Sequence, residues 1–249
     1  MKIYIVDIET SPNLAYVWGL WKQNVLPNQM VTPSVIMSYA AKRLGYKKTY
    51  YRDNRGGMKR MLKGIWKILD DADIVVGHNS DKFDIKLINA AFARHGMKPP
   101  SPYLQIDTLK EAKKKFRFAR NSLAHIAEDL GVRKKSKHAK FPGMTLWLEC
   151  LMGNEGAWEE MKQYNIEDVL VTEEVYLVLR PWMSNHPNVA DADGTVACPK
   201  CGSHNIEYRG YYTSRAGITY RRFRCKDCGG WGRVAMTDKE TLKRLGRNV

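Results

Sequence analysis

The pattern of apolar and polar positions divides the first 180 residues of the chain into strands and helices. Runs rich in β-branched and aromatic residues predict strands at 2–8, 14–20, 35–44, 47–52, 74–76 and 103–107. Apolar positions that recur every three or four residues predict helices at 58–69, 84–94, 122–130 and 155–180. Pro181 ends the last helix and Ser122 is placed to cap the third. Strands followed by alternating helices and strands predict an α/β domain whose mixed sheet is covered by helices.

The rest of the chain differs in composition, which predicts a second domain. Residues 181–197 read PWMSNHPNVADADGTVA, a composition typical of a linker, and paired cysteines follow directly. A chain of 249 residues has room for one large domain and one small one. We therefore predict domains at 1–182 and 198–249, joined by a linker at 183–197. No apolar run reaches the length of a membrane span, so no membrane partner is expected.

The charge of the chain indicates its partner. The 41 Lys and Arg residues outnumber the 26 Asp and Glu residues, a formal net charge of +15. Such a surface attracts nucleic acid, because neutralised phosphates release condensed counterions. Residues 110–140 hold 11 basic and 3 acidic residues interleaved with Phe116 and Phe118, which suits backbone tracking and base stacking, although a charged run is often only a solvated face. The candidate substrate contacts there are Lys113, Lys114, Lys115, Arg117 and Arg120, and a second basic cluster spans 133–140.

Two acids in the first predicted strand indicate a candidate metal site. Side chains alternate along a strand, so Asp7 and Glu9 project from one face near its C-terminal end. The strand is apolar on both faces, as is typical of a central strand. Carboxylates this close raise each other's pKa and repel, and a divalent cation between them reverses that penalty. The alternative is that both acids lie beyond the sheet, in solvent.

Two further acids need an explanation. Asp84 opens the second helix, where it either complements the helix dipole or joins a site. In the last helix, positions from Met161 to Val178 form one stripe that faces the core, and Asp168 lies within it. A buried carboxylate is costly without a partner, and a metal ion shared with the other acids would serve. Tyr164 lies one turn earlier on the same face, either as core packing or as part of the site.

The small domain carries a metal-ligand pattern. Two C-x-x-C pairs are separated by 23 residues, and four thiolates at this spacing indicate a structural zinc site. Disulfides are not expected, because we expect a cytoplasmic, reducing environment. Strand-forming residues with Gly210 and Gly217 between the pairs predict a β-hairpin, so this domain is interpreted as a zinc ribbon. The expected zinc ligands are Cys198, Cys201, Cys225 and Cys228.

Three short segments together resemble the exonuclease motifs of the DnaQ-like, or DEDD, superfamily. They are Asp7-Ile8-Glu9-Thr10, Asn79 with Phe83-Asp84, and Tyr164-Asn165-Ile166-Glu167-Asp168. A tyrosine four residues before the last aspartate is similar to the DEDDy branch. The segment 106–109 and the helix at 122–131 are also similar to that family. The resemblance covers roughly residues 1–180.

The resemblance implies an RNase H-like fold and two Mg²⁺ or Mn²⁺ ions held by Asp7, Glu9, Asp84 and Asp168. One ion would activate the attacking water and the other would stabilise the leaving 3′ oxygen. Tyr164 would orient the water, and the substrate would contact Thr10 and Asn79. Asp107 is expected to be structural.

The resulting hypothesis is a 3′–5′ exonuclease that hydrolyses phosphodiester bonds, DNA being favoured over RNA. It would act in phage or bacterial DNA replication, repair or degradation, in the cytoplasm of a bacterial cell or phage-infected host. The zinc ribbon would hold nucleic acid or a replication or repair protein. One alternative is an RNA-processing exoribonuclease. Another is a non-catalytic nucleic-acid-binding zinc-ribbon adaptor, which the complete set of four acids disfavours.

Overall fold

The computed structural model describes residues 1–132, 140–190 and 194–236. The chain forms two compact units, one of residues Lys2–Tyr176 and one of Leu177–Val249 with Met1. Most of the predicted basic cluster at 133–140, part of the linker and the C-terminal tail from 237 lie outside the described residues. None of the helices in the described ranges is long and apolar enough to cross a membrane.

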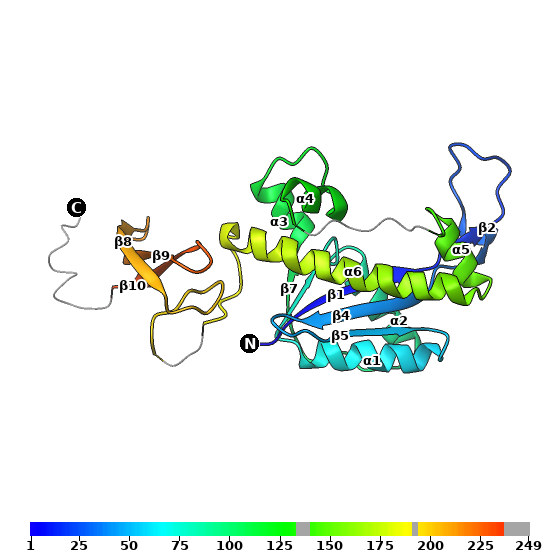
Figure 1. Cartoon of the computed structure of the whole chain (residues 1–249), viewed down its shortest axis with the longest axis horizontal. Coiled ribbons are helices and arrows are strands. Elements are labelled where there is room, and N and C mark those ends of the chain that lie inside the picture. The colour runs from blue at the N-terminus through cyan, green and yellow to red at the C-terminus, as the bar shows by residue number, and fades with distance from the viewer. Residues whose placement is uncertain (133–139, 191–193, 237–249) are drawn as a thin grey trace. The chain divides into compact units, whose positions relative to one another are not determined.

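A five-stranded mixed sheet forms the centre of the larger unit (Figure 1). In sheet order the strands are β5 (Thr49–Asp53), β4 (Ile36–Arg43), β1 (Ile3–Thr10), β6 (Ile74–Gly77) and β7 (Leu104–Asp107). The β1–β4 and β4–β5 pairs are antiparallel. The β1–β6 and β6–β7 pairs are parallel. The predicted central position of the first strand is confirmed.

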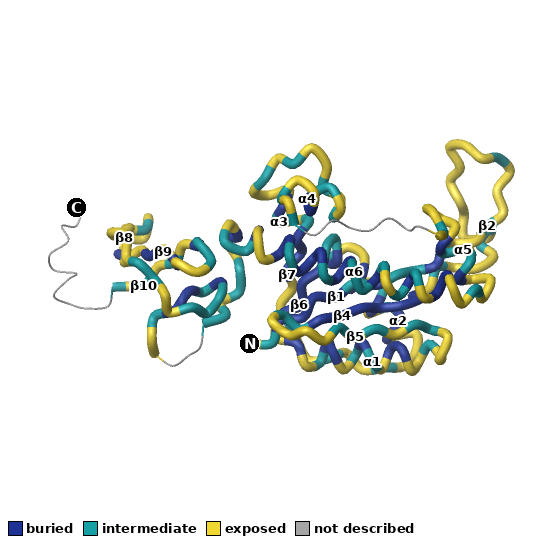
Figure 2. The backbone as a smooth tube through the Cα atoms, viewed as in Figure 1, coloured by how far each residue is buried: buried dark blue, intermediate teal, exposed yellow. Residues whose placement is uncertain are grey.

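Helices cover both faces of this sheet (Figure 1). Tyr4, Val6 and Ile8 of β1 share a buried core with α1 (Met58–Asp71) and α2 (Asp84–Arg94). The side chains on the opposite face of β1 alternate with these and point toward α6 (Glu155–Leu179). Figure 2 shows the central strands buried beneath both layers. The predicted α/β fold with an RNase H-like mixed sheet is therefore present.

One predicted strand, 14–20, is wrong. Only β2 (Leu14–Ala15) is extended there, paired with β3 (Met30–Thr32), and a 3₁₀ turn at Pro27–Gln29 precedes β3. Trp18 and its neighbours are exposed. Strand propensity reflects packing against neighbours more than backbone preference, and residues 16–26 have no strand beside them in the described residues.

Other differences concern short helices and the ends of predicted ones. Two helices were not predicted, α3 (Thr108–Lys115) and α5 (Thr145–Leu151). Helix α4 (Leu123–Asp129) follows Ser122 as predicted, but the serine side chain makes no capping bond. On α6, Val178 is exposed and Leu179 is buried instead, because a period of 3.6 residues carries the stripe from Val175 to the later position.

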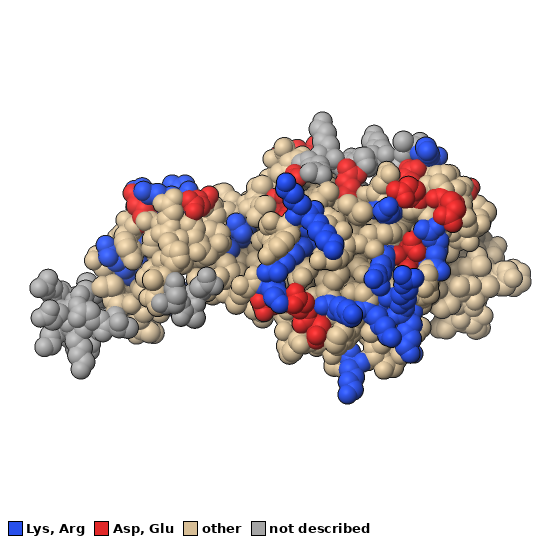
Figure 3. Space-filling view, turned by 60° about the horizontal axis from the view of Figure 1, so that its bottom comes forward, with Lys and Arg blue, Asp and Glu red and all other residues tan. Residues whose placement is uncertain are grey.

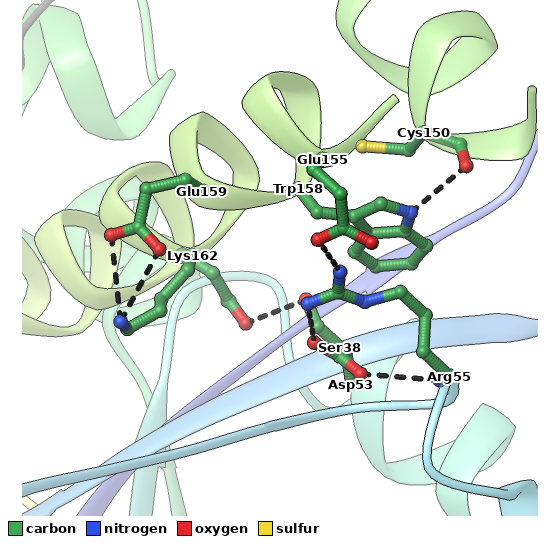
Figure 4. A network of polar contacts seen from close by, with 9 residues as sticks. Ser38, Asp53, Arg55, Cys150, Glu155, Trp158, Glu159 and Lys162 are labelled. Carbon is green, nitrogen blue, oxygen red and sulfur yellow. Dashed lines mark hydrogen bonds and ion pairs between the residues drawn. The ribbon is translucent and has the colours of Figure 1, made fainter. Parts of the chain in front are cut away.

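The start of α6 is fastened to the loop after β5 by Arg55 (Figure 4). Its guanidinium binds Asp53 at 2.8 Å and Glu155 at 2.5 Å. It also lies 4.9 Å from the ring centroid of Trp158, whose indole N–H donates to the Cys150 carbonyl. These contacts hold the start of α6 in place. The polar residues further along this helix then reach the sheet.

The smaller unit contains a three-stranded antiparallel sheet in the order β10-β9-β8. Its strands are β8 (Ile206–Thr213), β9 (Thr219–Cys225) and β10 (Trp231–Ala235), and a 3₁₀ turn at Arg180–Trp182 lies near the start of the unit. The predicted hairpin is present as β8 and β9, and a third strand joins it. Arg221 lies 3.6 Å from the ring centroid of Tyr208, so cations and aromatic rings share this surface.

Candidate functional site

Three predicted acids come together where α6 crosses the end of β1. One oxygen each from Asp7, Glu9 and Asp168 lies within 4.8 Å of the others. Asp7 and Glu9 project from the α6 face of β1 and are partly exposed, whereas Asp168 is buried. The alternation of side chains along β1 and the helical stripe of α6 therefore bring 3 carboxylates, from elements far apart in the sequence, to one point.

The chemistry of this cluster suits a divalent cation. Carboxylate oxygens are the ligands that Mg²⁺ and Mn²⁺ prefer. Three negative groups this close repel one another, and a cation among them converts the repulsion into attraction. The residues present therefore fit a metal site, open on the side of Asp7 and Glu9.

The fourth predicted acid, Asp84, lies beside the cluster and outside that group of three. Its Oδ1 accepts a hydrogen bond of 3.1 Å from the backbone N–H of Ile8, the residue between Asp7 and Glu9. Burial raises the pKa of Asp84 to about 6, because a low-dielectric surrounding disfavours the charged form. Asp84 thus reaches the same strand end from the first turn of α2.

Asn165 is part of the site, although it was not predicted as a site residue. Its Nδ2 donates to Asp7 Oδ2 at 2.6 Å, and Ser38 Oγ donates to its Oδ1 at 3.0 Å. Ser38 and Asn165 are fully buried. This relay holds the Asp7 carboxylate in one orientation. Its signal in the sequence is a polar residue three positions before Asp168, hence on the same helix face.

A cavity of about 370 Å³ opens next to the acid cluster. It is lined by Ile8, Glu9, Thr10, Ser11, Pro12, Phe83, Met144 and Trp147. Glu9 belongs to both the cavity and the cluster. The ring of Trp147 meets that of Tyr164 edge-to-face, with centroids 5.8 Å apart. The unpredicted helix α5 therefore supplies an aromatic wall that links Tyr164 to the cavity.

The other predicted substrate residues are placed differently. Thr10 lines the cavity, and Asn79 forms a left-handed turn after β6 (φ 63°). The backbone N–H of Asn79 donates to Asp107 Oδ1, and Asp107 also caps α3, as its expected structural role requires. The five candidate cations, Lys113, Lys114, Lys115, Arg117 and Arg120, are exposed at and just after the end of α3. That helix follows β7, which is separated from β1 by β6.

The aromatic residues among these cations stack on each other. The rings of Phe116 and Phe118 are 5.3 Å apart and nearly parallel. The three lysines lie in the last turn of α3, where cations also complement the helix dipole. The segment is therefore a basic, aromatic surface on the β7 side of the larger unit.

The four cysteines of the smaller unit form a second cluster that could hold a metal ion. Cys198 Sγ and Cys228 Sγ are 3.7 Å apart, as are Cys201 Sγ and Cys225 Sγ. A disulfide requires about 2.05 Å between its sulfurs. A tetrahedral ion with bonds of about 2.3 Å separates its ligands by about 3.8 Å. The spacing therefore fits four thiolates around one ion.

The fold and the acid cluster define a class of protein. The chain belongs to the RNase_H superfamily, whose model matches residues 4–180. Membership in this superfamily supports a nucleic-acid-cleaving function that uses divalent metal ions.

A solved structure shares the fold. The family B DNA polymerase from the hyperthermophilic archaeon Pyrobaculum calidifontis aligns with a TM-score of 0.54 and 16% sequence identity. The alignment covers 72% of this chain and 25% of the polymerase chain, so this protein corresponds to a quarter of the polymerase's length. No curated protein matches the chain.

Proposed function

We propose that this protein is a two-metal-ion 3′–5′ exonuclease of the DEDDy type that acts on DNA 3′ ends. The observation that carries the proposal is the cluster of Asp7, Glu9 and Asp168 beside an aromatic cavity, on an RNase H-like sheet. A carboxylate cluster alone would suit many metal sites. A cavity of about 370 Å³ that shares Glu9 with it has room for a terminal nucleotide.

Each acid has a place in this proposal. Asp7, Glu9 and Asp168 would hold one ion directly, and Asp84 would complete the site of a second from the α2 side. When bound, such ions supply an activated water and stabilise the leaving 3′ oxygen. Ser38 and Asn165 keep the Asp7 carboxylate from rotating. Burial keeps Asp168 away from bulk water, which strengthens its electrostatic interactions.

The cavity would position the end of the strand. Phe83 and Trp147 offer faces on which a terminal base can stack, and base–aromatic stacking tolerates every base. Thr10 lines the same cavity as these rings and Glu9, and its hydroxyl would contact the sugar. A strand end bound there presents its last phosphodiester to the acid cluster.

The smaller unit would be a zinc ribbon, with zinc held by Cys198, Cys201, Cys225 and Cys228. Its stacked cations and aromatic rings support a role in holding nucleic acid. A replication or repair protein is the other partner to test. In this proposal the protein serves bacterial or phage DNA metabolism.

The hydroxyl of Tyr164 is proposed to orient the attacking water, so Tyr164→Phe should slow cleavage without weakening metal binding. Loss of one positioning contact is expected to lower the single-turnover rate on the order of 10–1000-fold. Mn²⁺ titration should be unchanged, because no carboxylate is removed. Tyr103→Phe, which removes a hydroxyl elsewhere in the same unit, is the matched control. Equal rates for the two variants would reduce Tyr164 to a packing role.

The proposal is tested by the product ladder of end-labelled oligonucleotides. With Mg²⁺ or Mn²⁺, a 5′-labelled DNA strand should shorten one nucleotide at a time, and a 3′-labelled strand should release its label as a mononucleotide first. Degradation of RNA alone would favour an exoribonuclease. Internal cuts would refute exonuclease action, and binding without cleavage would favour the adaptor hypothesis.

A further inference from the structure

A second groove, of about 820 Å³, runs along β5 and α1. Strand β5 is at the edge of the sheet, and α1 lies on the face opposite α6 (Figure 1). The groove shares no lining residue with the cavity beside the acid cluster. Its lining includes no Asp or Glu and six basic residues, Lys48, Arg52, Lys59, Arg60, Lys63 and Lys67.

These six cations differ from others of the described residues in making no ion pair. Arg55 pairs with Asp53, Lys110 pairs with Asp81, and Lys162 lies 3.4 Å from Glu159. Within the described residues, no groove cation forms an ion pair. Figure 3 turns this side of the molecule toward the viewer and shows Lys and Arg side chains gathered on it. Unpaired like charges in one groove repel, so a polyanion is the ligand that the groove fits best.

The local sequence explains the row of charges. Helix α1 buries Met61, Leu62, Ile65, Ile68 and Leu69, and its acids appear only at its last two residues. Lys59, Lys63 and Lys67 are spaced by four residues, so they form one exposed row about 12 Å long. A row of this length can contact several successive phosphates of one strand.

The floor of the groove depends on Gly64. A Cβ at this position would lie 2.4 Å from the Tyr39 hydroxyl and 3.2 Å from Arg52 Cδ. Glycine inside a helix is less stable than alanine, and here its lack of a side chain lets Tyr39 and Arg52 approach the helix. On the other wall, Lys48 lies 4.9 Å from the ring centroid of Tyr50. The groove thus combines cations with tyrosine rings.

The groove begins at the same end of the sheet as the acid cluster. In the strand registers Glu9 pairs with Ser38, and Ser38 pairs with Asp53. Arg52, which lines the groove, precedes Asp53 directly. A strand whose end lies at Glu9 would reach this groove by passing around the edge strand β5 toward α1.

We infer that the groove between β5 and α1 binds the phosphate backbone of the nucleic acid, at a distance from the bond that is cleaved. This inference rests on the proposed function only in taking the bound strand to be the substrate. The contacts are phosphate contacts, so they add affinity and carry no base sequence preference.

The test measures binding of a 20-nucleotide single-stranded DNA over a salt series, in the full-length Asp168→Asn protein without added Mg²⁺. Combining Lys59→Ala, Lys63→Ala and Lys67→Ala should lower the slope of log affinity against log salt by about 2, at about 0.7 per phosphate contact. Affinity should fall by about tenfold or more at low salt. The corresponding triple Lys→Arg protein should bind like the parent, since the charge remains.

The matched control combines Lys86→Ala, Arg94→Ala and Lys98→Ala, which removes three exposed charges outside the groove. Unfolding melts should be alike for all variants, because every altered side chain is exposed. Equal affinities and slopes for the groove and control variants would overturn the inference.

The two proposals fail in different ways. If the wild type cleaves DNA but the groove variant binds no more weakly than the control variant, the inference about the groove is refuted and the proposed nuclease function stands. If only the groove variant loses affinity and the wild type cleaves no substrate, the proposed nuclease function is refuted and the inference about the groove stands. With cleavage intact, a tetranucleotide too short to span the groove should be cleaved equally by parent and groove variant, whereas the KM for long strands should rise. Equal KM changes for both lengths would contradict a distant contact.

Discussion

Asp168→Asn is expected to reduce cleavage about 10³-fold or more, and Asp7→Asn and Glu9→Gln should do the same. Each change keeps the shape of the side chain and removes one charged ligand from the group whose oxygens lie within 4.8 Å of one another. Loss of a single preorganised electrostatic contact typically slows an enzyme 10²–10³-fold, and loss of a metal ligand removes the ion's whole contribution as well. Single-turnover rates in saturating Mg²⁺ measure the effect.

Stability separates this effect from damage to the fold. In metal-free buffer the same variants should melt no lower than the wild type, because a mutually repelling carboxylate has been removed. Glu173→Gln on the same helix is the matched control. Glu173 is a buried carboxylate whose partner, Lys42, is also buried, so losing that pair should lower stability and leave Mn²⁺ affinity unchanged. Near-wild-type turnover of any of the three cluster variants would refute its assignment as a ligand.

Asp84→Asn should also nearly abolish cleavage, for a related reason. An asparagine Oδ1 can still accept the hydrogen bond from Ile8, so the end of β1 should keep its structure while one charge is lost. A variant with full activity would show that Asp84 only fastens α2 to the strand.

Cys201→Ser is expected to unfold the smaller unit and remove its metal. Structural zinc supplies much of the folding free energy of small modules, and the small sheet of this unit has few buried large side chains in the described residues. Zinc released on denaturation should fall from one per chain to none, and residues 198–236 should become sensitive to protease. The affinity of the protein for long DNA strands should fall, and this affinity should depend less steeply on salt.

Cleavage of short substrates should survive this change, because all four acids and Tyr164 precede residue 177, in the larger unit. Cys150→Ala is the matched control, since this buried cysteine lies in the larger unit and is not one of the four clustered cysteines. It should leave one zinc per chain. A Cys201→Ser protein that kept its metal would contradict the four-thiolate site. Unchanged DNA affinity after metal loss would instead assign the ribbon to a protein partner.

Local periodicity was enough to determine much of this protein. Alternation in β1 placed Asp7 and Glu9 on one face, and the helical stripe in α6 placed Asp168 on the face turned to the core. Both periods are properties of the backbone, so they hold wherever the element packs. The spacing of the cysteines likewise predicted their cluster, because paired ligands on tight turns need little help from distant residues.

Only the tertiary structure decided which distant residues meet. The hydrogen bond between Asp7 and Asn165 spans 158 residues. The helical period places Asn165 on the same face as Asp168, but it does not show that this side chain meets Asp7. The aromatic wall from Trp147 and the basic groove between β5 and α1 also depend on which elements become neighbours. The stretch at 14–20 has strand-forming residues and forms almost no strand, because a strand is stabilised by the partner beside it, and topology alone determines whether that partner is there.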